Sequence, residues 1–102
     1  MRDKGCRMAL PHYVTETQIL RRVAHDPKCS WRFTSHALEE MAADGWTADD
    51  VQHALMNGQV VLHEQKQDLL WRVEGMDIDG GRIRVVVAVY ELTIRIKVIT
   101  TF

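Results

Sequence analysis

Residues 82–102 read RIRVVVAVYELTIRIKVITTF, and this stretch decides the fold. It contains two long runs rich in β-branched residues, 82–90 and 93–102, on either side of Glu91-Leu92. Such runs are typical of strands, and their close spacing predicts an antiparallel hairpin with a two-residue loop.

The loop sets the register of the hairpin. If Glu91-Leu92 forms the loop, Tyr90 lies opposite Thr93, and one face of the hairpin is almost wholly apolar. That face is expected on the core. The opposite face carries the polar side chains, which are Arg82, Arg84, Tyr90, Arg95 and Lys97.

Residues 69–75 are predicted to form the preceding strand, joined to the hairpin by a turn over 77–81. Keeping the apolar residues on one face places Arg72 directly across from Arg84, with Lys97 diagonally beyond. Like charges directly opposite each other destabilise a sheet, so their convergence favours an anion site, most naturally for phosphate. Basic residues on outer sheet faces are also common because they solvate well and discourage edge pairing, and this plainer interpretation stays open.

Upstream of these strands, apolar residues recur at the spacing of a helix. Caps and breakers predict helices over 15–26, 35–44 and 47–57. Short strands are expected over 30–33 and 60–62. This order predicts an α+β fold in which N-terminal helices pack on one face of an antiparallel β-meander. Residues 1–12 lack periodicity and are expected to form a flexible arm, which leaves 13–102 as a single domain.

Length and composition bound the function. A chain of 102 residues forms one domain. Its net charge of −1 is unlike that of a dedicated nucleic-acid binder, although residues 1–32 carry seven basic and three acidic groups. No apolar run is long enough to cross a membrane. Cys6 and Cys29 match no metal or disulfide pattern, so we expect reduced thiols and a cytoplasmic protein.

His36 is the histidine with the clearest chemical alternatives. Glu39 and Glu40 follow at helical spacing and could complete a metal site, but no second ligand pair is visible. A structural histidine at the start of a helix is the commoner case. Its imidazole could also act as a general acid or base. The sequence predicts neither a metal nor a cofactor.

Two segments carry a resemblance to known families. Residues 33–41 (FTSHALEEM) and 45–51 (GWTADDV) resemble the opening of a small bacterial domain-of-unknown-function family with a Ser-x-His-Ala start. An Arg-Val pair like Arg72-Val73 and a closing aliphatic strand ending on threonine belong to the same pattern. The layout is also similar to that of the MqsR toxins, in which a short Trp-Arg-x-Thr-like strand leads into two helices and a Trp-containing strand follows.

The resemblance implies a RelE-like fold and the toxin component of a type II toxin–antitoxin system. Such a toxin is an mRNA endoribonuclease, and its partners would be a cognate antitoxin and an RNA substrate. We expect a metal-independent attack of the 2′-OH on phosphorus, with Arg72, Arg84 and Lys97 stabilising charge and Tyr90 or His36 moving protons. The remaining expected RNA contacts are Arg82, Arg95 and Arg32. The alternatives are a non-catalytic RelE-like module that binds RNA or a protein and, less favoured, a metal-dependent hydrolase.

Overall fold

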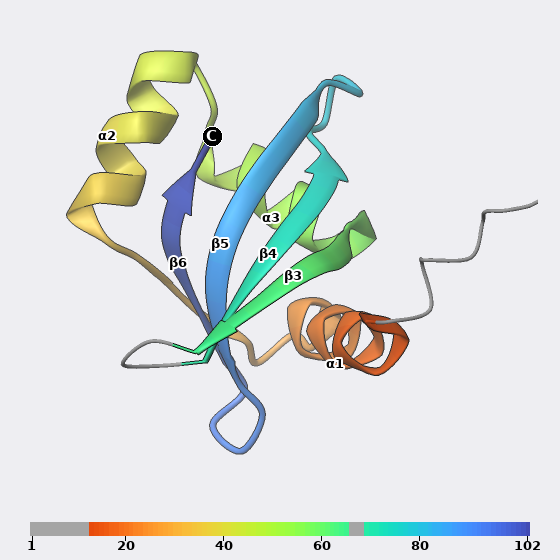
Figure 1. Cartoon of the computed structure of the whole chain (residues 1–102). Helices are drawn as coiled ribbons and strands as arrows, with labels where there is room; N and C mark the ends of the chain where they lie inside the picture. The colour runs from red at the N-terminus through yellow and green to blue at the C-terminus, as the bar shows by residue number, and fades with distance from the viewer. Residues whose placement is uncertain (1–12, 66–68) are drawn as a thin grey trace, which may run out of the picture.

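The computed structural model describes residues 13–65 and 69–102, which form an α+β fold of three helices and a five-stranded sheet (Figure 1). The α+β prediction is confirmed, whereas the predicted arm over 1–12 lies outside the described residues. In chain order the elements are α1 (Val14–His25), β2 (Ser30–Phe33), α2 (Ser35–Asp44), α3 (Ala48–Asn57), β3 (Gln59–Gln65), β4 (Leu69–Met76), β5 (Arg82–Tyr90) and β6 (Arg95–Thr101).

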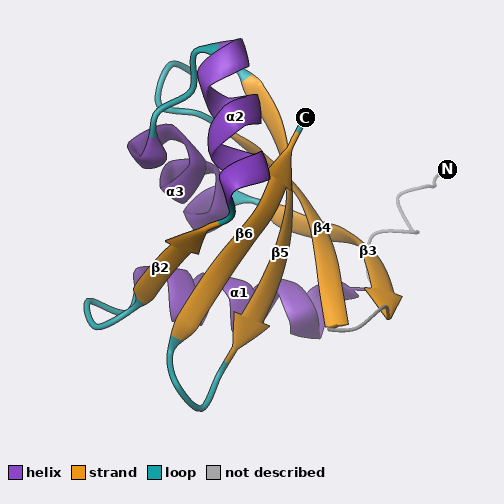
Figure 2. Cartoon of the chain, turned by 90° about the vertical axis from the view of Figure 1, so that its left-hand side faces the viewer, coloured by secondary structure: helices purple, strands orange, loops and turns teal. Residues whose placement is uncertain are grey.

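The sheet is mixed, not purely antiparallel as the sequence predicted. Its strand order is β2-β6-β5-β4-β3. The strands from β3 to β6 form the expected antiparallel meander, but β2 joins the far edge beside β6 and runs parallel to it (Figure 2). Among the described residues, the first and last strands are therefore neighbours.

The predicted hairpin register is wrong by two residues. The loop between β5 and β6 has four residues, Glu91–Ile94, so Tyr90 pairs with Arg95 rather than with Thr93. Because side chains alternate with a period of two, this shift leaves every residue near the loop on its predicted face. A bulge further along the pair then turns Thr101 into the core, where it is fully buried.

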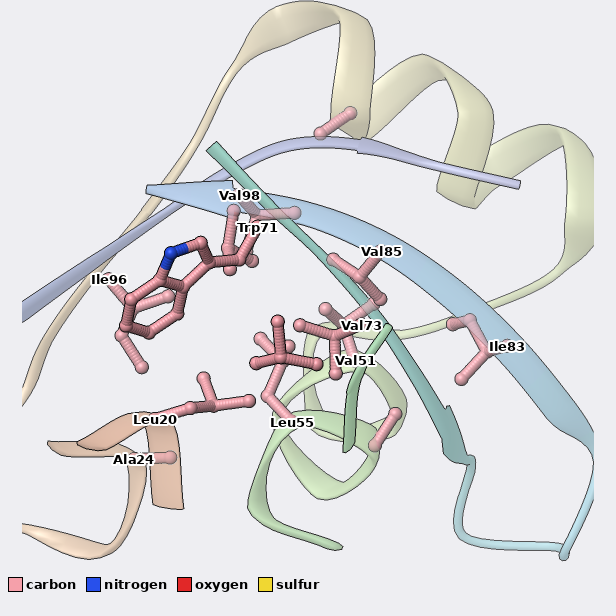
Figure 3. Close-up of a cluster of buried hydrophobic side chains, with 14 of the residues drawn as sticks. Leu20, Ala24, Val51, Leu55, Trp71, Val73, Ile83, Val85, Ile96 and Val98 are labelled. Atoms are coloured by element: carbon pink, nitrogen blue, oxygen red, sulfur yellow. The ribbon is translucent and has the colours of Figure 1, made fainter. Parts of the chain in front are cut away.

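A hydrophobic core lies between one face of the sheet and the helices α1 and α3 (Figure 3). Leu20 of α1 and Leu55 of α3 meet Val73, Val85 and Val98 of the strands there, and all five are fully buried. Burial of side chains of this size stabilises a fold by about 1.5–3 kcal/mol each. In Figure 1 the strands face the viewer with α3 behind them, and α2 packs against β6.

Helix α3 approaches the sheet unusually closely because glycines face it. A Cβ atom added to Gly75 of β4 would lie 2.2 Å from the carbonyl oxygen of Ala54 in α3. One added to Gly58, the C-cap of α3, would lie 2.7 Å from Cγ1 of Val73 and 2.9 Å from the carbonyl oxygen of Glu74, both on β4. Only glycine leaves room for this approach. The contact holds α3 against one face of the sheet, and no helix of the described residues lies over β4 and β5 on the other face.

Side-chain caps stand at the starts of α2 and α3. The side chain of Thr34 accepts a hydrogen bond from the Ala37 amide at the start of α2. Thr47 and Asp50 form a capping box at the start of α3. No helix among the described residues is long and apolar enough to span a membrane.

Candidate functional site

The face of the sheet opposite α1 and α3 carries the polar residues of β5 and β6. On β6, Ile96 and Val98 are buried in the core, so Arg95 and Lys97 project from the other face. Tyr90 projects from the same face at the end of β5. We call this surface the open face.

A pocket of about 250 Å³ opens at the β2–β6–β5 edge of the open face. Its volume approaches that of small-ligand sites, which begin near 300 Å³. The described residues that line it are Arg32, Phe33, Thr34, Tyr90, Arg95 and Lys97. Three of these six side chains are cationic and none is acidic.

The strand pairings bring these cations together. Arg32 of β2 is the register partner of Lys97 of β6 in the parallel pair. One step along, Arg95 pairs with Tyr90 of β5, and its guanidinium carbon lies 4.6 Å from the centre of the Tyr90 ring. This cation–π contact contributes about 0.5–1 kcal/mol and holds the Arg95 guanidinium over the ring.

The Arg95 guanidinium keeps hydrogen-bonding capacity for a ligand. Its Nε is buried and finds no acceptor among the described residues. Its terminal nitrogens form no hydrogen bond with a described residue either, and they are not among the buried unpaired atoms. They are therefore accessible donors at the wall of the pocket.

Two acids among the described residues form ion pairs with arginines outside the pocket. Glu91, next to Tyr90 in the chain, contacts Arg22 of α1 at 2.7 Å. Glu74 of β4 contacts Arg84 of β5 at 3.3 Å. Among the described residues no acid forms an ion pair with any of the three pocket cations. The pocket is thus a local positive site on a chain whose net charge is −1.

The start of α2 forms one wall of the pocket. Thr34 donates a hydrogen bond from Oγ1 to the carbonyl oxygen of Ile99 at 2.7 Å, while the same oxygen atom accepts from the Ala37 amide at 3.0 Å. This double contact ties the helix start to β6. The amide end of a helix carries partial positive charge, which adds to that of the cations.

Ile94 holds the backbone just before Arg95. It is the only described non-glycine residue with positive φ, at 49°, a conformation that is rare for β-branched residues. Its side chain packs against the core, and its carbonyl oxygen accepts the Ser30 amide at 2.9 Å. The side chain and the carbonyl oxygen of Ile94 thus fix the backbone immediately before Arg95.

The structure brings together four of the eight predicted site residues. Tyr90, Lys97, Arg95 and Arg32 line the same pocket, although the sequence placed the anion site around Arg72 instead. Phe33 and Thr34 were missed. The Trp31-Arg32-Phe33-Thr34 segment was recognised as a strand, but its pairing with β6 carries no local sequence signal.

The other predicted site residues lie elsewhere. The prediction that Arg72 lies directly opposite Arg84 is wrong, because Arg72 pairs with Val86 and Arg84 pairs with Glu74. Like the hairpin, this strand pair is shifted by two residues. Arg72 and Lys97 are two strands and two residues apart, which separates their Cα atoms by roughly 12 Å.

Arg82 and His36 also lie outside the pocket lining. Arg82 is exposed at the far end of β5, where it pairs with Met76. His36 is exposed in the first turn of α2, two residues after Thr34. Within residues 13–65 and 69–102, no three His, Cys, Asp or Glu side chains gather as metal donors.

A family model described as a domain of unknown function, DUF4258, matches residues 33–102. The match covers β2's last residue, both later helices and every strand of the antiparallel meander. The chain belongs to the DUF4258 family. No curated protein and no solved structure matches it. The DUF4258 region supplies five of the six residues that line the pocket, and Arg32 immediately precedes it.

Proposed function

We propose that this DUF4258 protein is an RNA-cleaving toxin of a type II toxin–antitoxin system, with a RelE-like fold. The observation that carries the proposal is the pocket on the open face, where Arg32, Arg95 and Lys97 gather without acidic partners among the described residues. Clustered arginine and lysine side chains bind phosphate through charge-assisted hydrogen bonds. A pocket at the edge of an open sheet also admits a phosphodiester from an extended strand of RNA.

The proposed reaction is intramolecular transesterification. The 2′-oxygen of the substrate loses its proton and bonds to the adjacent phosphorus. The bond from phosphorus to the 5′-oxygen then breaks, and that oxygen takes up a proton. The products are a 2′,3′-cyclic phosphate and a free 5′-hydroxyl, so no external reactant is consumed.

The pocket residues divide the work between charge stabilisation and proton transfer. Lys97 and the terminal nitrogens of Arg95 stabilise the added charge on the pentacoordinate phosphorus, which is usually the largest catalytic contribution. Tyr90 supplies the hydroxyl that exchanges protons with the reacting oxygens. Arg32, on the exposed edge strand, binds the neighbouring phosphate. His36, beside the rim of the pocket, is the second proton-transfer candidate.

Cleavage of a labelled single-stranded RNA by the purified protein tests this proposal. We expect Lys97→Ala to slow cleavage about 10²-fold or more, because it removes one stabilising charge. Tyr90→Phe should slow cleavage comparably while preserving affinity, because it keeps the ring beneath Arg95 and removes only the hydroxyl. Product ends identified by mass spectrometry should be a cyclic phosphate and a 5′-hydroxyl.

Arg82→Ala is the matched control, because Arg82 is an exposed arginine on β5 outside the pocket. It should cleave as the unaltered protein does. If Arg82→Ala and Lys97→Ala behave alike, the pocket is not the active site.

A second candidate function is RNA binding without cleavage. It is favoured by one observation: of the described residues that line the pocket, none is a carboxylate or a histidine. Tyr90 and Lys97 are then the only lining groups able to exchange a proton. A protein that binds RNA with Lys97-dependent affinity and leaves it intact over hours would establish this function instead.

An antitoxin partner follows from the same charge pattern. The proposed toxin would be inhibited by a protein segment that places carboxylates in the pocket and excludes phosphate. Such a complex would be cytoplasmic, where the RNA substrate is found. Co-purification with the product of a neighbouring gene, and its loss in Arg95→Glu, would identify this partner.

A further inference from the structure

A second arginine–aromatic stack lies on the open face, outside the pocket. The guanidinium carbon of Arg72, on β4, is 5.1 Å from the centre of the Phe102 ring. The Nε of Arg72 is buried without an acceptor among the described residues, like that of Arg95. The Phe102 side of this stack is accessible, because Phe102 is 44% exposed.

The backbone fixes the position of this second stack on the sheet. Phe102 donates its amide to the Arg84 carbonyl oxygen at 2.8 Å and accepts the Arg84 amide at 3.1 Å, which continues the pairing of β5 with β6. Arg72 pairs with Val86 on the other side of β5. The stack therefore lies four to six residues along β5 from Tyr90, or roughly 13–20 Å.

The two stacks are joined by a continuous strip of the open face. Between them β5 presents Val86 and Ala88, whose short apolar side chains are buried, and Lys97 lies opposite Ala88. The strip thus has a planar cation on an aromatic ring at each end and a lysine between them. We name it the β5 strip.

We propose that the β5 strip holds an extended single strand of RNA, with one base on the Arg95–Tyr90 stack and another on the Arg72–Phe102 stack. The phosphates between these bases pass Lys97. This inference rests on the proposed function, because it extends the substrate from one phosphate to a segment of several nucleotides. The β5 strip also gives Arg72 a role in binding RNA. Arg72 lies too far from the pocket to take part in catalysis there.

The chemistry of the strip matches nucleic acid better than a simple anion. Unpaired bases stack on aromatic rings and on arginine guanidinium planes, whereas a phosphate ion needs neither. Each base–aromatic stack typically contributes a factor of about five to a hundred in affinity. A base-paired strand cannot use the stacks, because its bases already stack on each other.

Binding of uncleavable oligonucleotides tests the strip apart from catalysis. The probe is a fluorescent ten-nucleotide 2′-O-methyl oligouridylate, and its fluorescence anisotropy reports affinity. We expect Phe102→Ala to weaken binding about tenfold, since it removes the ring of the second stack. Arg72→Lys, which keeps the charge but not the flat guanidinium, should weaken binding in the same direction.

Two further probes separate stacking from charge. A ten-residue abasic oligonucleotide carries the same phosphates without bases, and a dinucleotide is too short to span both stacks. Phe102→Ala should bind both as the unaltered protein does. Ile78→Ala, at an exposed apolar residue on the turn before β5, is the matched control and should bind all three probes normally.

The outcomes are distinguishable. Unchanged binding of the ten-nucleotide probe by Phe102→Ala, or an equal loss with the abasic probe, would overturn the stacking role. If Lys97→Ala still weakens the binding of all three probes, the proposed pocket stands even though the stacking role has failed. If Lys97→Ala weakens none of them, the proposed function fails as well.

Discussion

Asp50 illustrates how much one side chain can hold in place at the start of α3. One carboxylate oxygen accepts the Thr47 amide at 3.0 Å, and the other accepts the Ile78 amide at 3.3 Å. These contacts lower the pKa of Asp50 below its ordinary value, chiefly through the hydrogen bond from the Thr47 backbone. The residue thereby joins the capping box of α3 to the turn between β4 and β5.

The direction of this pKa shift sets a pH dependence. A carboxyl whose pKa is lower in the folded protein stabilises the fold fully above its unfolded pKa, here the ordinary value of 3.8, and loses that contribution as pH falls through the folded pKa. We therefore predict that Asp50→Asn is less stable than the unaltered protein near neutral pH. The difference should shrink as the pH falls below about 4, as measured by urea unfolding at a series of pH values.

Asp49→Asn is the control for this prediction. It removes the same charge from the same first turn of α3, but no hydrogen bond of its carboxylate is seen among the described residues. A pH-dependent loss of equal size in both variants would mean that the helix dipole, not the hydrogen bonds of Asp50, carries the effect.

At the scale of elements, α3 and β4 lie in close contact. Gly75 has no side chain where the Ala54 carbonyl passes, so the helix lies nearly on the strand backbone. The side chain of Asn57 locks the same junction, because it accepts the Met76 amide at 3.1 Å and donates to the Met76 carbonyl at 3.1 Å. Helix and strand thus behave as one unit.

We predict that Gly75→Ala destabilises the fold by about 1–3 kcal/mol, because the added Cβ must push α3 away from β4. Thermal or urea unfolding measures this loss. Gly81→Ala is the comparison: its Cβ would meet only the carboxylate of Asp77, at 3.0 Å, on an exposed turn where the side chain can move. Equal losses in the two variants would show that the α3–β4 contact is not specially tight.

The strands also show which parts of the fold could be predicted from the sequence. Alternation of apolar and polar residues in 82–102 predicted which side chains face the core, and the faces near the hairpin loop are correct. It could not predict the register, because a shift of two residues preserves every face. The loop Glu91–Ile94 also contains no glycine or asparagine that would have marked its length.

The candidate site was only half predictable for a related reason. Tyr90 and Lys97 were found because they project from predicted strands on the polar face. Their grouping with Arg32 depends on the parallel pairing of β2 with β6, which joins residues more than sixty positions apart. Four residues between two helices carry no pattern that specifies a distant partner or a strand direction.

At the scale of the whole molecule, the net charge of the chain does not predict which ligand the pocket binds. The chain is slightly acidic, with its acidic excess in residues 33–66, whereas the pocket gathers at one edge of the sheet three cations that form no ion pair with a described acid. Opposite charges are screened beyond about 10 Å at ordinary ionic strength, so the local field at the pocket decides which ions enter.

The ionic-strength dependence of the proposed RNA binding follows from this local charge. If three phosphates are neutralised, the logarithm of the association constant should fall with the logarithm of salt concentration with a slope of about −2. Lys97→Ala should reduce the magnitude of that slope by about 0.7. Titrations with the uncleavable oligonucleotide at several salt concentrations measure both values. A slope near zero in the unaltered protein would contradict phosphate binding at the pocket.

The parallel pairing of β2 with β6 has a consequence for when the pocket can form during synthesis. A ribosome makes residues 30–33 more than sixty residues before the strand with which they pair. Until Arg95 to Thr101 have emerged, Arg32 has no neighbour at Lys97 and the walls of the pocket do not exist. A chain whose synthesis stops before β6 therefore lacks this pocket, and any ligand of the pocket can bind only after β2 and β6 have paired.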